Sequence, residues 1–360
     1  MSDLGSLIFY IMAFSFSALI INYASKISER KSLTRISIII IGLMIPIIIG
    51  GVRYKVGTDY TNYIDSYNVF KNYSIDQMFE SQTEIMFGII LKVATLFNNP
   101  QILFWIFSFL TVIVMYLSIK DNSQKLSIGL MMFIFLFLNY TTSFNIIRQA
   151  LAVVIVVYAY KFIFSRELVK FLCTMLIASM FHITAILFIP FYWINASNVK
   201  VKKFTQVFLA ILLLIIISQY GNFMSVLSNI SGFERFESYA DINNSIGNNR
   251  EIIINTILLA IISILKKPLE EYDSRNKLYI YFYFISWILT FTGFISPYVK
   301  RIALYFEMSI IFLLATIPKI TKNKYQKVLA EFLIILYVLG MFTISAYILK
   351  QGDIIPYNII

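Results

Sequence analysis

The fold is decided by residues 4–35, which read LGSLIFYIMAFSFSALIINYASKISERKSLTR. Residues 4–24 are almost entirely apolar, and about 20 such residues suffice for a helix to cross the hydrocarbon core of a bilayer. The basic residues that follow directly are Lys26, Arg30, Lys31 and Arg35. Basic loops favour the cytoplasmic side, so this stretch predicts a membrane helix with its N-terminus outside. No basic region precedes the run and no small-residue cleavage site follows it, which favours a retained helix over a signal peptide.

The composition extends this interpretation to the whole chain. Of 360 residues, 59% are hydrophobic and 14% are charged, whereas soluble domains carry about 25% charged residues. These values exclude a soluble enzyme, a disordered protein and a secreted disulfide scaffold. The net charge of +11 comes largely from basic residues that flank apolar runs, so membrane topology explains it without nucleic acid. The single cysteine, Cys173, can form neither an intramolecular disulfide nor a cysteine metal site.

Further apolar runs predict an all-α, polytopic integral membrane protein with about 12 transmembrane helices, in a range of roughly 10–13. The clear runs are residues 4–24, 36–52, 102–119, 126–142, 150–164, 204–220, 252–265, 278–295, 302–318 and 328–349. Residues 168–193 are too long for one upright span, so we interpret them as a hairpin that turns near His182. The other basic clusters then fall on the cytoplasmic side, provided that residues 83–97 enter and leave from outside.

This topology gives one transmembrane domain over residues 1–360. Residues 51–100 are expected to form an external loop plus a re-entrant or interfacial helix. Residues 221–250 are expected to form a second external loop, rich in Asn, Ser and Gly. We interpret this loop as contacting an acceptor substrate.

Three arginines lie at the outer ends of separate predicted helices. Arg53 ends the second span, Arg148 begins the span that follows NII, and Arg301 begins a late span after SPYVK. One such arginine can simply extend to the lipid headgroups, but basic residues are disfavoured on this side, so three favour a function. A guanidinium group forms bidentate, charge-assisted bonds to phosphate. Lys300 beside Arg301 adds to the positive charge. The arginines predict a lipid phosphate or pyrophosphate as ligand, although anionic headgroups also fit.

The external stretch GVRYKVGTDYTNYIDSYNVFKNYSIDQMFE, residues 51–80, combines tyrosines with carboxylates. Flat rings can stack on sugar rings while oxygens bind the hydroxyls, so the stretch is a candidate glycan surface. An interfacial aromatic belt explains the same pattern.

Gly57 allows a tight turn here, and Thr58 or Asp59 is a candidate N-cap for a helix that begins near Tyr60. The side chains expected on one face of that helix are Asp59, Tyr63 and Tyr67.

His182 is the only histidine and falls on the same side as the arginines. A lone histidine cannot build a histidine metal cluster and is more often a buried donor, but a general-base role is open to it. No P-loop, GxGxxG, zinc or GxSxG motif occurs, so nucleotide-driven transport and the common hydrolase chemistries lack support. We expect no metal and no cofactor.

An ordered series of short motifs resembles the EpsG-like branch of the Wzy-type polysaccharide repeat-unit polymerases. The motifs are GVRYKVGTDYTNYIDSY at 51–67, TEIMFGIILK at 83–92, NIIRQALA at 145–152, FHITA at 181–185 and RIALYF at 301–306. FHITA has Thr184 where a serine is more usual, a change that keeps the hydroxyl. The resemblance covers most of the chain.

The resemblance implies a GT-C-like glycosyltransferase bundle in the bacterial cytoplasmic membrane, with its active site facing outside. It would join repeat units carried on polyprenyl pyrophosphate into capsule, exopolysaccharide or O-antigen. The expected catalytic residues are Asp59, His182, Arg148 and Arg301. The expected substrate-binding residues are Arg53, Thr58, Tyr60, Tyr63, Tyr67, Glu84, Gln149 and Tyr305.

In this hypothesis the arginines stabilise the pyrophosphate leaving group, and Asp59 or His182 acts on the attacking sugar hydroxyl. The expected partners are a polyprenyl-pyrophosphate-linked oligosaccharide and membrane lipid, with flippase and chain-length regulator proteins as candidates. A lipid-linked oligosaccharide flippase or exporter is the main alternative, and it predicts polar residues through the middle of the bundle. A glycan ligase, an acyltransferase and a purely structural partner of a glycan assembly complex also stay open.

Overall fold

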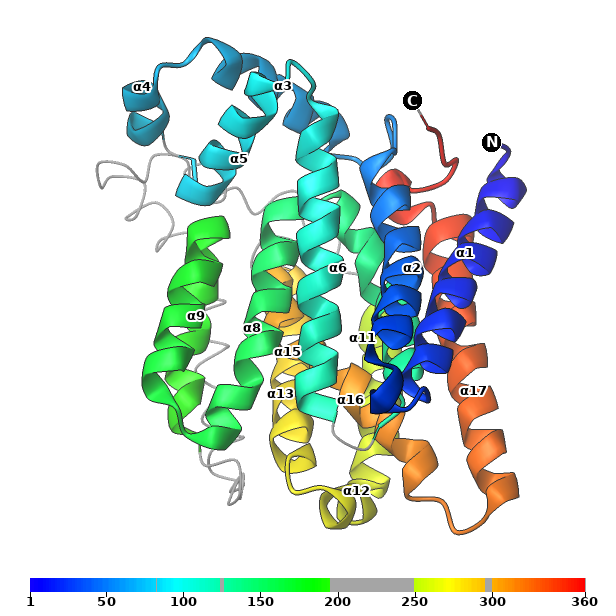
Figure 1. The fold of residues 1–360 in the computed structure, drawn as a ribbon. Coiled ribbons are helices and arrows are strands. Elements are labelled where there is room, and N and C mark those ends of the chain that lie inside the picture. Colours follow the sequence, from blue (N-terminus) through cyan, green and yellow to red (C-terminus); the bar gives the residue numbers. More distant parts are fainter. Residues whose placement is uncertain (82, 124–125, 195–248, 295–299, 360) are drawn as a thin grey trace. The chain divides into compact units, whose positions relative to one another are not determined.

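A computed structural model describes residues 1–81, 83–123, 126–194, 249–294 and 300–359 (Figure 1). Within these ranges the regular elements are helices, as the sequence predicts. The chain divides into two compact units, Met1–Ile189 with Leu314–Ile360 and Pro190–Leu313, and each is described by itself. The predicted span at 204–220 and nearly all of the predicted loop at 221–250 lie outside the described residues.

Long helices alternate with short helical turns. Up to residue 194 they are α1 (Asp3–Ser25), η1 (Glu29–Lys31), α2 (Ser32–Gly51), α3 (Tyr60–Asn72), α4 (Ile75–Glu80), α5 (Ile85–Leu96), α6 (Gln101–Ser123), α7 (Ile128–Phe135), η2 (Leu136–Tyr140), η3 (Thr141–Phe144), α8 (Ile147–Ser165), α9 (Leu168–Phe181) and η4 (Ile183–Trp193). From residue 249 they are α11 (Asn249–Ile264), α12 (Lys266–Tyr272), α13 (Asn276–Thr290), η7 (Phe291–Phe294), η8 (Arg301–Ala303), α15 (Leu304–Glu307), α16 (Ser309–Thr316), η9 (Ile317–Lys319), α17 (Lys324–Phe342), η10 (Thr343–Ile348) and η11 (Gln351–Asp353).

The exposed faces of the long helices are apolar. On α1, Met12 is 67% exposed and Leu19 is 65% exposed, while Tyr10 and Phe14 on the opposite face are fully buried. A soluble protein rarely exposes apolar patches of this extent, whereas a helix in contact with lipid does so on its outer face. Six helices among the described residues are long and apolar enough to cross a membrane, or seven if the bent pair α11 and α12 counts as one. The fold is therefore that of a polytopic membrane protein, while the count of about 12 spans and the GT-C-like arrangement stay predictions.

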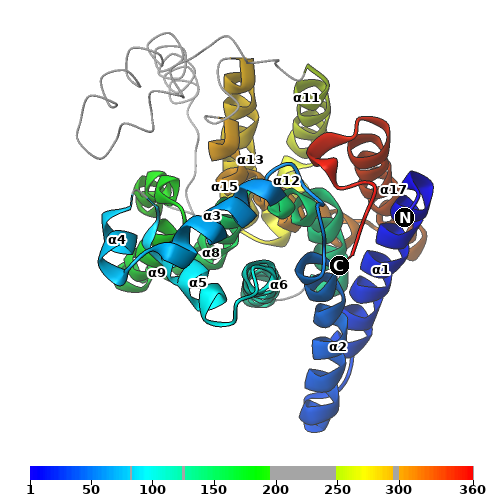
Figure 2. The ribbon, with the colours of Figure 1, turned by 90° about the horizontal axis from the view of Figure 1, so that it is seen from above.

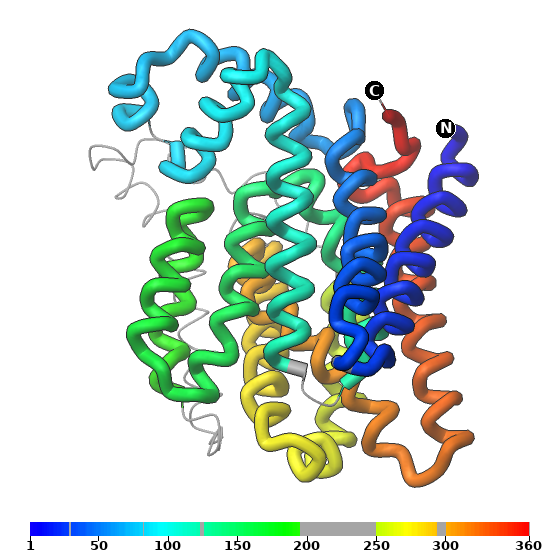
Figure 3. Tube along the Cα trace, in the orientation of Figure 1, coloured from blue at the N-terminus to red at the C-terminus, as the bar shows by residue number. Residues whose placement is uncertain are grey.

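The helices of the first unit alternate in direction. α6 packs against α2 and α8, α8 packs against α9, and α1 packs against α2 and α7. The tube in Figure 3 shows that the C-terminal ends of α1, α6 and α8 lie at one end, whereas α3, α4 and α5 lie at the other. These helix ends contain or adjoin described residues of the first three predicted cytoplasmic basic clusters, among them Lys26, Lys120 and Lys161. The geometry of this unit thus agrees with the predicted alternation, while the side of the membrane on which each end lies stays a prediction.

The segment between α2 and α6 forms a helical cap at one end of the first unit. Seen from above, α3, α4 and α5 lie across that end (Figure 2). α5 has 12 residues and is about 18 Å long, so it is too short to cross a hydrocarbon core of about 30 Å. This length favours the re-entrant or interfacial helix predicted for residues 83–97.

The helix breaks at His182, the residue near which the sequence predicts a hairpin turn. α9 ends at Phe181, His182 has an extended backbone (φ −156°, ψ 116°), and η4 begins at the next residue. The break places the His182 side chain at the end of a helix rather than within one.

Candidate functional site

Arg53 lies in the loop between α2 and α3, and the structure buries it completely. Its side chain is 1% exposed, and Nη1 donates to the carbonyls of Val56 at 2.5 Å and Phe144 at 2.8 Å. The guanidinium group lies over the rings of Phe104 and Phe144, 4.5 and 4.7 Å from their centroids. Burial lowers the pKa of this group to about 10, so Arg53 is still a cation at neutral pH. In this position the side chain holds the loop to η3 and α6 rather than presenting its charge to a ligand.

The next residues of the loop are fixed by Asn145. Gly57 has φ +99°, and a Cβ atom there would lie 2.8 Å from Asn145 Oδ1 and 2.9 Å from the Phe144 carbonyl. Glycine adopts this conformation without a steric penalty, which confirms the predicted tight turn. Thr58 donates to Asn145 Oδ1 from both its backbone N–H and its hydroxyl, at 2.6 and 3.1 Å. The loop is therefore held against the start of α8.

The helix predicted to begin near Tyr60 begins there, with Asp59 at its N-cap position. The Asp59 side chain makes no cap hydrogen bond, so its half-buried carboxylate is not used in capping. Tyr60, Tyr63 and Tyr67 are all buried. Tyr63 donates to the Asn145 carbonyl at 2.8 Å. The three rings are thus packed within the protein, and the sugar contacts expected of them stay a prediction.

Glu84 brings together three helix ends that are distant in the sequence. It is the N-cap residue of α5, Arg148 lies in the first turn of α8, and His182 follows the end of α9. Arg148 Nη1 pairs with Glu84 Oε2, and His182 Nδ1 lies 3.2 Å from Glu84 Oε1. We call these residues the Glu84 cluster. The sequence assigned its members to separate roles, and the structure brings them into contact.

The exposure of the Glu84 cluster decides what each member can do. The Glu84 side chain is 7% exposed, whereas those of Arg148 and His182 are 33% and 23% exposed. Burial opposes ionisation of the Glu84 carboxyl, but the hydrogen bond to His182 and the charge of Arg148 outweigh it and hold its pKa at about 2. Glu84 is therefore ionised at neutral pH. The carboxylate orients the other two side chains, which have the access needed to meet a substrate.

A guanidinium group has five N–H donors, and the bond to Glu84 uses one of those of Arg148. The group also lies over the Phe87 ring, 4.8 Å from its centroid, so it is held on two sides. If Nδ1 of His182 carries the proton, it donates to Glu84 and leaves Nε2 as an acceptor. The cluster can therefore offer an anion-binding group and a base side by side.

Three other predicted residues lie on α8 and in the second unit. Gln149 is buried in α8. Arg301 and Tyr305 belong to the second unit, where Tyr305 is buried and Lys300 pairs with Glu251. The predicted cluster of three arginines spans both units and stays a prediction. Within the described residues, no group of three His, Cys, Asp or Glu side chains could hold a metal ion.

Sequence reasoning missed the segment after the last apolar run. The Tyr54 N–H donates to the Asn358 carbonyl at 2.9 Å, and the Gly57 N–H donates to the Asp353 carbonyl at 3.0 Å. The Tyr357 hydroxyl donates to the Ile49 carbonyl at 2.8 Å. These bonds fasten residues 353–358 to the end of α2 and to the loop that precedes α3. The signal in the sequence was the polar, proline-containing stretch QGDIIPYN, which breaks the apolar pattern.

The fold and this site together define a helical membrane protein with a polar cluster gathered where helix ends meet. The family comparison is more specific, because the family model described as "EpsG family" matches residues 35–359. The chain belongs to the EpsG family, which comprises polysaccharide polymerase-like membrane proteins. No curated protein and no solved structure gives a significant match.

Proposed function

We propose that this chain is a glycosyltransferase that joins oligosaccharide repeat units carried on polyprenyl pyrophosphate, at the outer face of the bacterial cytoplasmic membrane. The observation that carries the proposal is the Glu84 cluster in a member of the EpsG family. It pairs a base with a cation, and this reaction needs both. Among the residues predicted from the sequence, the cluster favours His182 over Asp59 as the base.

In the proposed reaction a sugar hydroxyl of one lipid-linked unit attacks the anomeric carbon of the growing chain. A C–O bond forms there, and the bond to the pyrophosphate oxygen breaks and leaves its electron pair on the pyrophosphate. His182 Nε2 takes the hydroxyl proton, and the ionised Glu84 stabilises the imidazolium that results. The exposed N–H groups of Arg148 stabilise the charge that develops on the pyrophosphate. The leaving group is already good, so no metal is required.

The position of the cluster favours this function over a flippase. A flippase moves a polar headgroup across the bilayer, so it is expected to line its path with polar side chains at mid-depth. Glu84, Arg148 and His182 instead lie at helix ends, on the end of the first unit that carries α3, α4 and α5.

The function is tested by deleting the gene, restoring it, and separating the surface or secreted polysaccharide of the host by size beside its lipid extracts. The proposal expects loss of long chains while single repeat units are still displayed outside. Restoration with Arg148→Ala or His182→Ala is expected not to recover long chains, although the variant protein accumulates in the membrane. Repeat units retained on the inner leaflet would instead indicate a flippase, and an unchanged polysaccharide would remove the proposal.

A further inference from the structure

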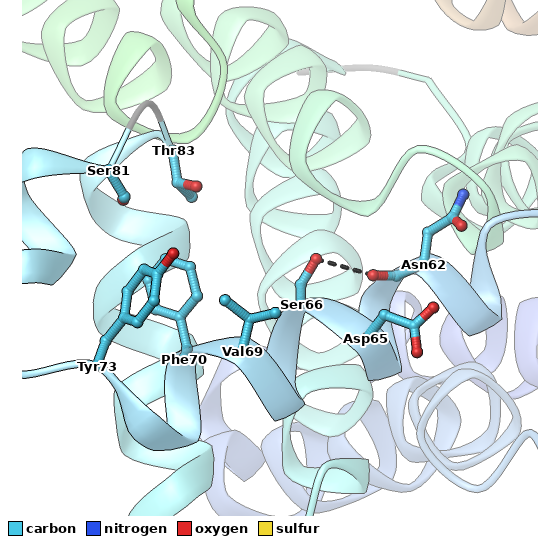
Figure 4. Close-up of a pocket in the computed structure, with 8 residues that line it drawn as sticks. All are labelled: Asn62, Asp65, Ser66, Val69, Phe70, Tyr73, Ser81 and Thr83. Carbon is cyan, nitrogen blue, oxygen red and sulfur yellow. Dashed lines mark hydrogen bonds between the residues drawn. The ribbon is translucent and has the colours of Figure 1, made fainter.

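A groove lies along the polar face of α3, beside the face that carries the buried tyrosines. Its volume is about 470 Å³, within the range of roughly 300–1,000 Å³ that is usual for small-ligand pockets. Figure 4 shows Asn62, Asp65 and Ser66 along α3, the rings of Phe70 and Tyr73 at its end, and Thr83 on the facing wall. Thr83 directly precedes Glu84, so the groove adjoins the Glu84 cluster through the chain itself.

The groove is held in shape by bonds around its rim. Ser74 and Gln77 form a capping box that begins α4 just after Tyr73. The Lys92 ammonium group, on α5, donates to the Tyr73 carbonyl. The rings of Phe70 and Tyr73 lie 5.1 Å apart. These contacts fix Tyr73 at the corner between α3 and α4, where its half-buried ring forms one end of the groove.

The chemistry of the lining matches a sugar ring. A pyranose has apolar C–H faces and hydroxyl groups around its edge, so it is recognised by a flat ring together with hydrogen-bonding oxygens and amides. The groove offers the Tyr73 ring, the Asn62 amide, the Asp65 carboxylate and the Thr83 hydroxyl. Among the described residues no hydrogen bond or ion pair engages the side chains of Asn62 and Asp65. Both are exposed and available to a ligand.

The charge of the lining narrows the class of sugar. Asp65 is the charged residue among those that line the groove, and its charge is negative. A carboxylate accepts hydrogen bonds from hydroxyl or ammonium groups and repels another carboxylate. The lining therefore favours neutral or amino sugars over uronic acids.

We propose that this groove binds one or two pyranose rings of the glycan substrate, neutral or amino-bearing, next to the Glu84 cluster. The inference rests on the proposed function and deepens it by moving the sugar contacts from Tyr60, Tyr63 and Tyr67 to the polar face of the same helix. On that face Asn62 and Asp65 bind hydroxyl or amino groups, and Tyr73 stacks on a ring face.

The test measures binding and polymerisation separately. The probe is the repeat-unit oligosaccharide released from the polysaccharide of the host, and binding to the purified chain in lipid nanodiscs is followed by saturation-transfer NMR. Asp65→Asn and Tyr73→Ala are each expected to weaken binding by roughly tenfold. Asn68→Ala is the matched control for Asn62→Ala, because Asn68 is an exposed asparagine of α3 outside the groove lining. It is expected to bind as the wild type does, whereas Asn62→Ala is expected to bind less well.

Arg148→Ala separates this inference from the proposed function. It is expected to abolish polymer and to keep oligosaccharide binding, because it lies outside the groove lining. If Arg148→Ala abolishes polymer while Asp65→Asn and Tyr73→Ala bind the oligosaccharide as the wild type does, the groove is not the sugar site and the proposed function stands. If Arg148→Ala leaves polymer unchanged, the proposed function fails whatever the groove variants do. A uronic-acid oligosaccharide that binds as tightly as its carboxyl-reduced form would overturn the assignment of the sugar class.

Discussion

Glu84→Gln is the substitution that tests the cluster most directly. It keeps the size of the side chain and one carbonyl oxygen, which can still accept from His182, but it removes the negative charge. Arg148 then loses its carboxylate partner, and an imidazolium formed at His182 loses the charge that stabilises it. We expect an inactive or nearly inactive protein that still folds into the membrane.

The structure gives a magnitude for this change. The pKa of Glu84 is lowered from 4.5 to about 2, a shift of about 2.5 units, and each unit corresponds to roughly 1.4 kcal/mol. The ionised carboxylate therefore stabilises the native state by at most about 3.5 kcal/mol relative to its protonated form. Because the folded pKa is depressed, this contribution is fully present above pH 4.5 and is lost as the pH falls toward 2. The turnover rate of Glu84→Gln is expected to be roughly 10²- to 10⁴-fold below that of the wild type, as is usual when general-base catalysis is disabled.

The assay is polymer formation by purified protein in liposomes supplied with lipid-linked repeat units, beside thermal unfolding of the same preparations between pH 2 and 7. Glu80→Gln is the matched control, because Glu80 is an exposed glutamate of the neighbouring α4, and it is expected to behave as the wild type. The unfolding difference between wild type and Glu84→Gln is expected to shrink as the pH falls from 4.5 to 2. A Glu84→Gln protein that polymerises at the wild-type rate would refute the assignment of the cluster to catalysis.

Three further predictions concern the loop before α3. Arg53→Met is expected to lower stability by roughly 1–3 kcal/mol, because the carbonyls of Val56 and Phe144 lose a buried donor; a melting temperature unchanged in detergent would contradict this role. Gly57→Ala is expected to destabilise the folded protein by more than about 1 kcal/mol, since the backbone of Gly57 has φ +99° and a Cβ there would lie 2.8 Å from Asn145 Oδ1. Equal melting temperatures of variant and wild type would count against this prediction. Deleting residues 353–359 removes the bonds to Tyr54 and Gly57, so limited chymotrypsin digestion is expected to cut the loop before α3 faster. An unchanged cleavage rate would show that residues 353–359 are not needed to hold this loop.

The sequence predicted the helical architecture well because the bilayer imposes a simple rule. Every backbone polar group in the hydrocarbon must be bonded within its own segment, so an apolar run of sufficient length becomes a helix whatever its neighbours are. The run at 4–24 became Asp3–Ser25, and the run at 328–349 became the candidate span Lys324–Ile348. The start of α3 at Tyr60 was also predicted, because local backbone chemistry decides it. The length of the run at 168–193 predicted an interruption near His182, and the helix breaks there.

The tyrosines of α3 show what the sequence argument leaves open. Helical periodicity correctly placed Tyr63 and Tyr67 on one face, but periodicity does not say which face turns inward. An amphipathic helix outside the bilayer can pack its aromatic face on the protein or present it to a ligand. The contacts with α5 decided for packing, and the groove formed on the polar face instead.

The sequence by itself determined that this chain is a helical membrane protein, the order and direction of the helices in its first unit, and the residues with chemistry to offer. The tertiary structure alone decided which of those residues lie in contact. Glu84 meets Arg148 and His182 across 64 and 98 positions of the chain, and Arg53 is enclosed by rings and carbonyls. The physical reason is that spans and turns follow from local hydrophobicity and backbone conformation, whereas a contact between helix ends depends on how the side chains of several helices pack at once.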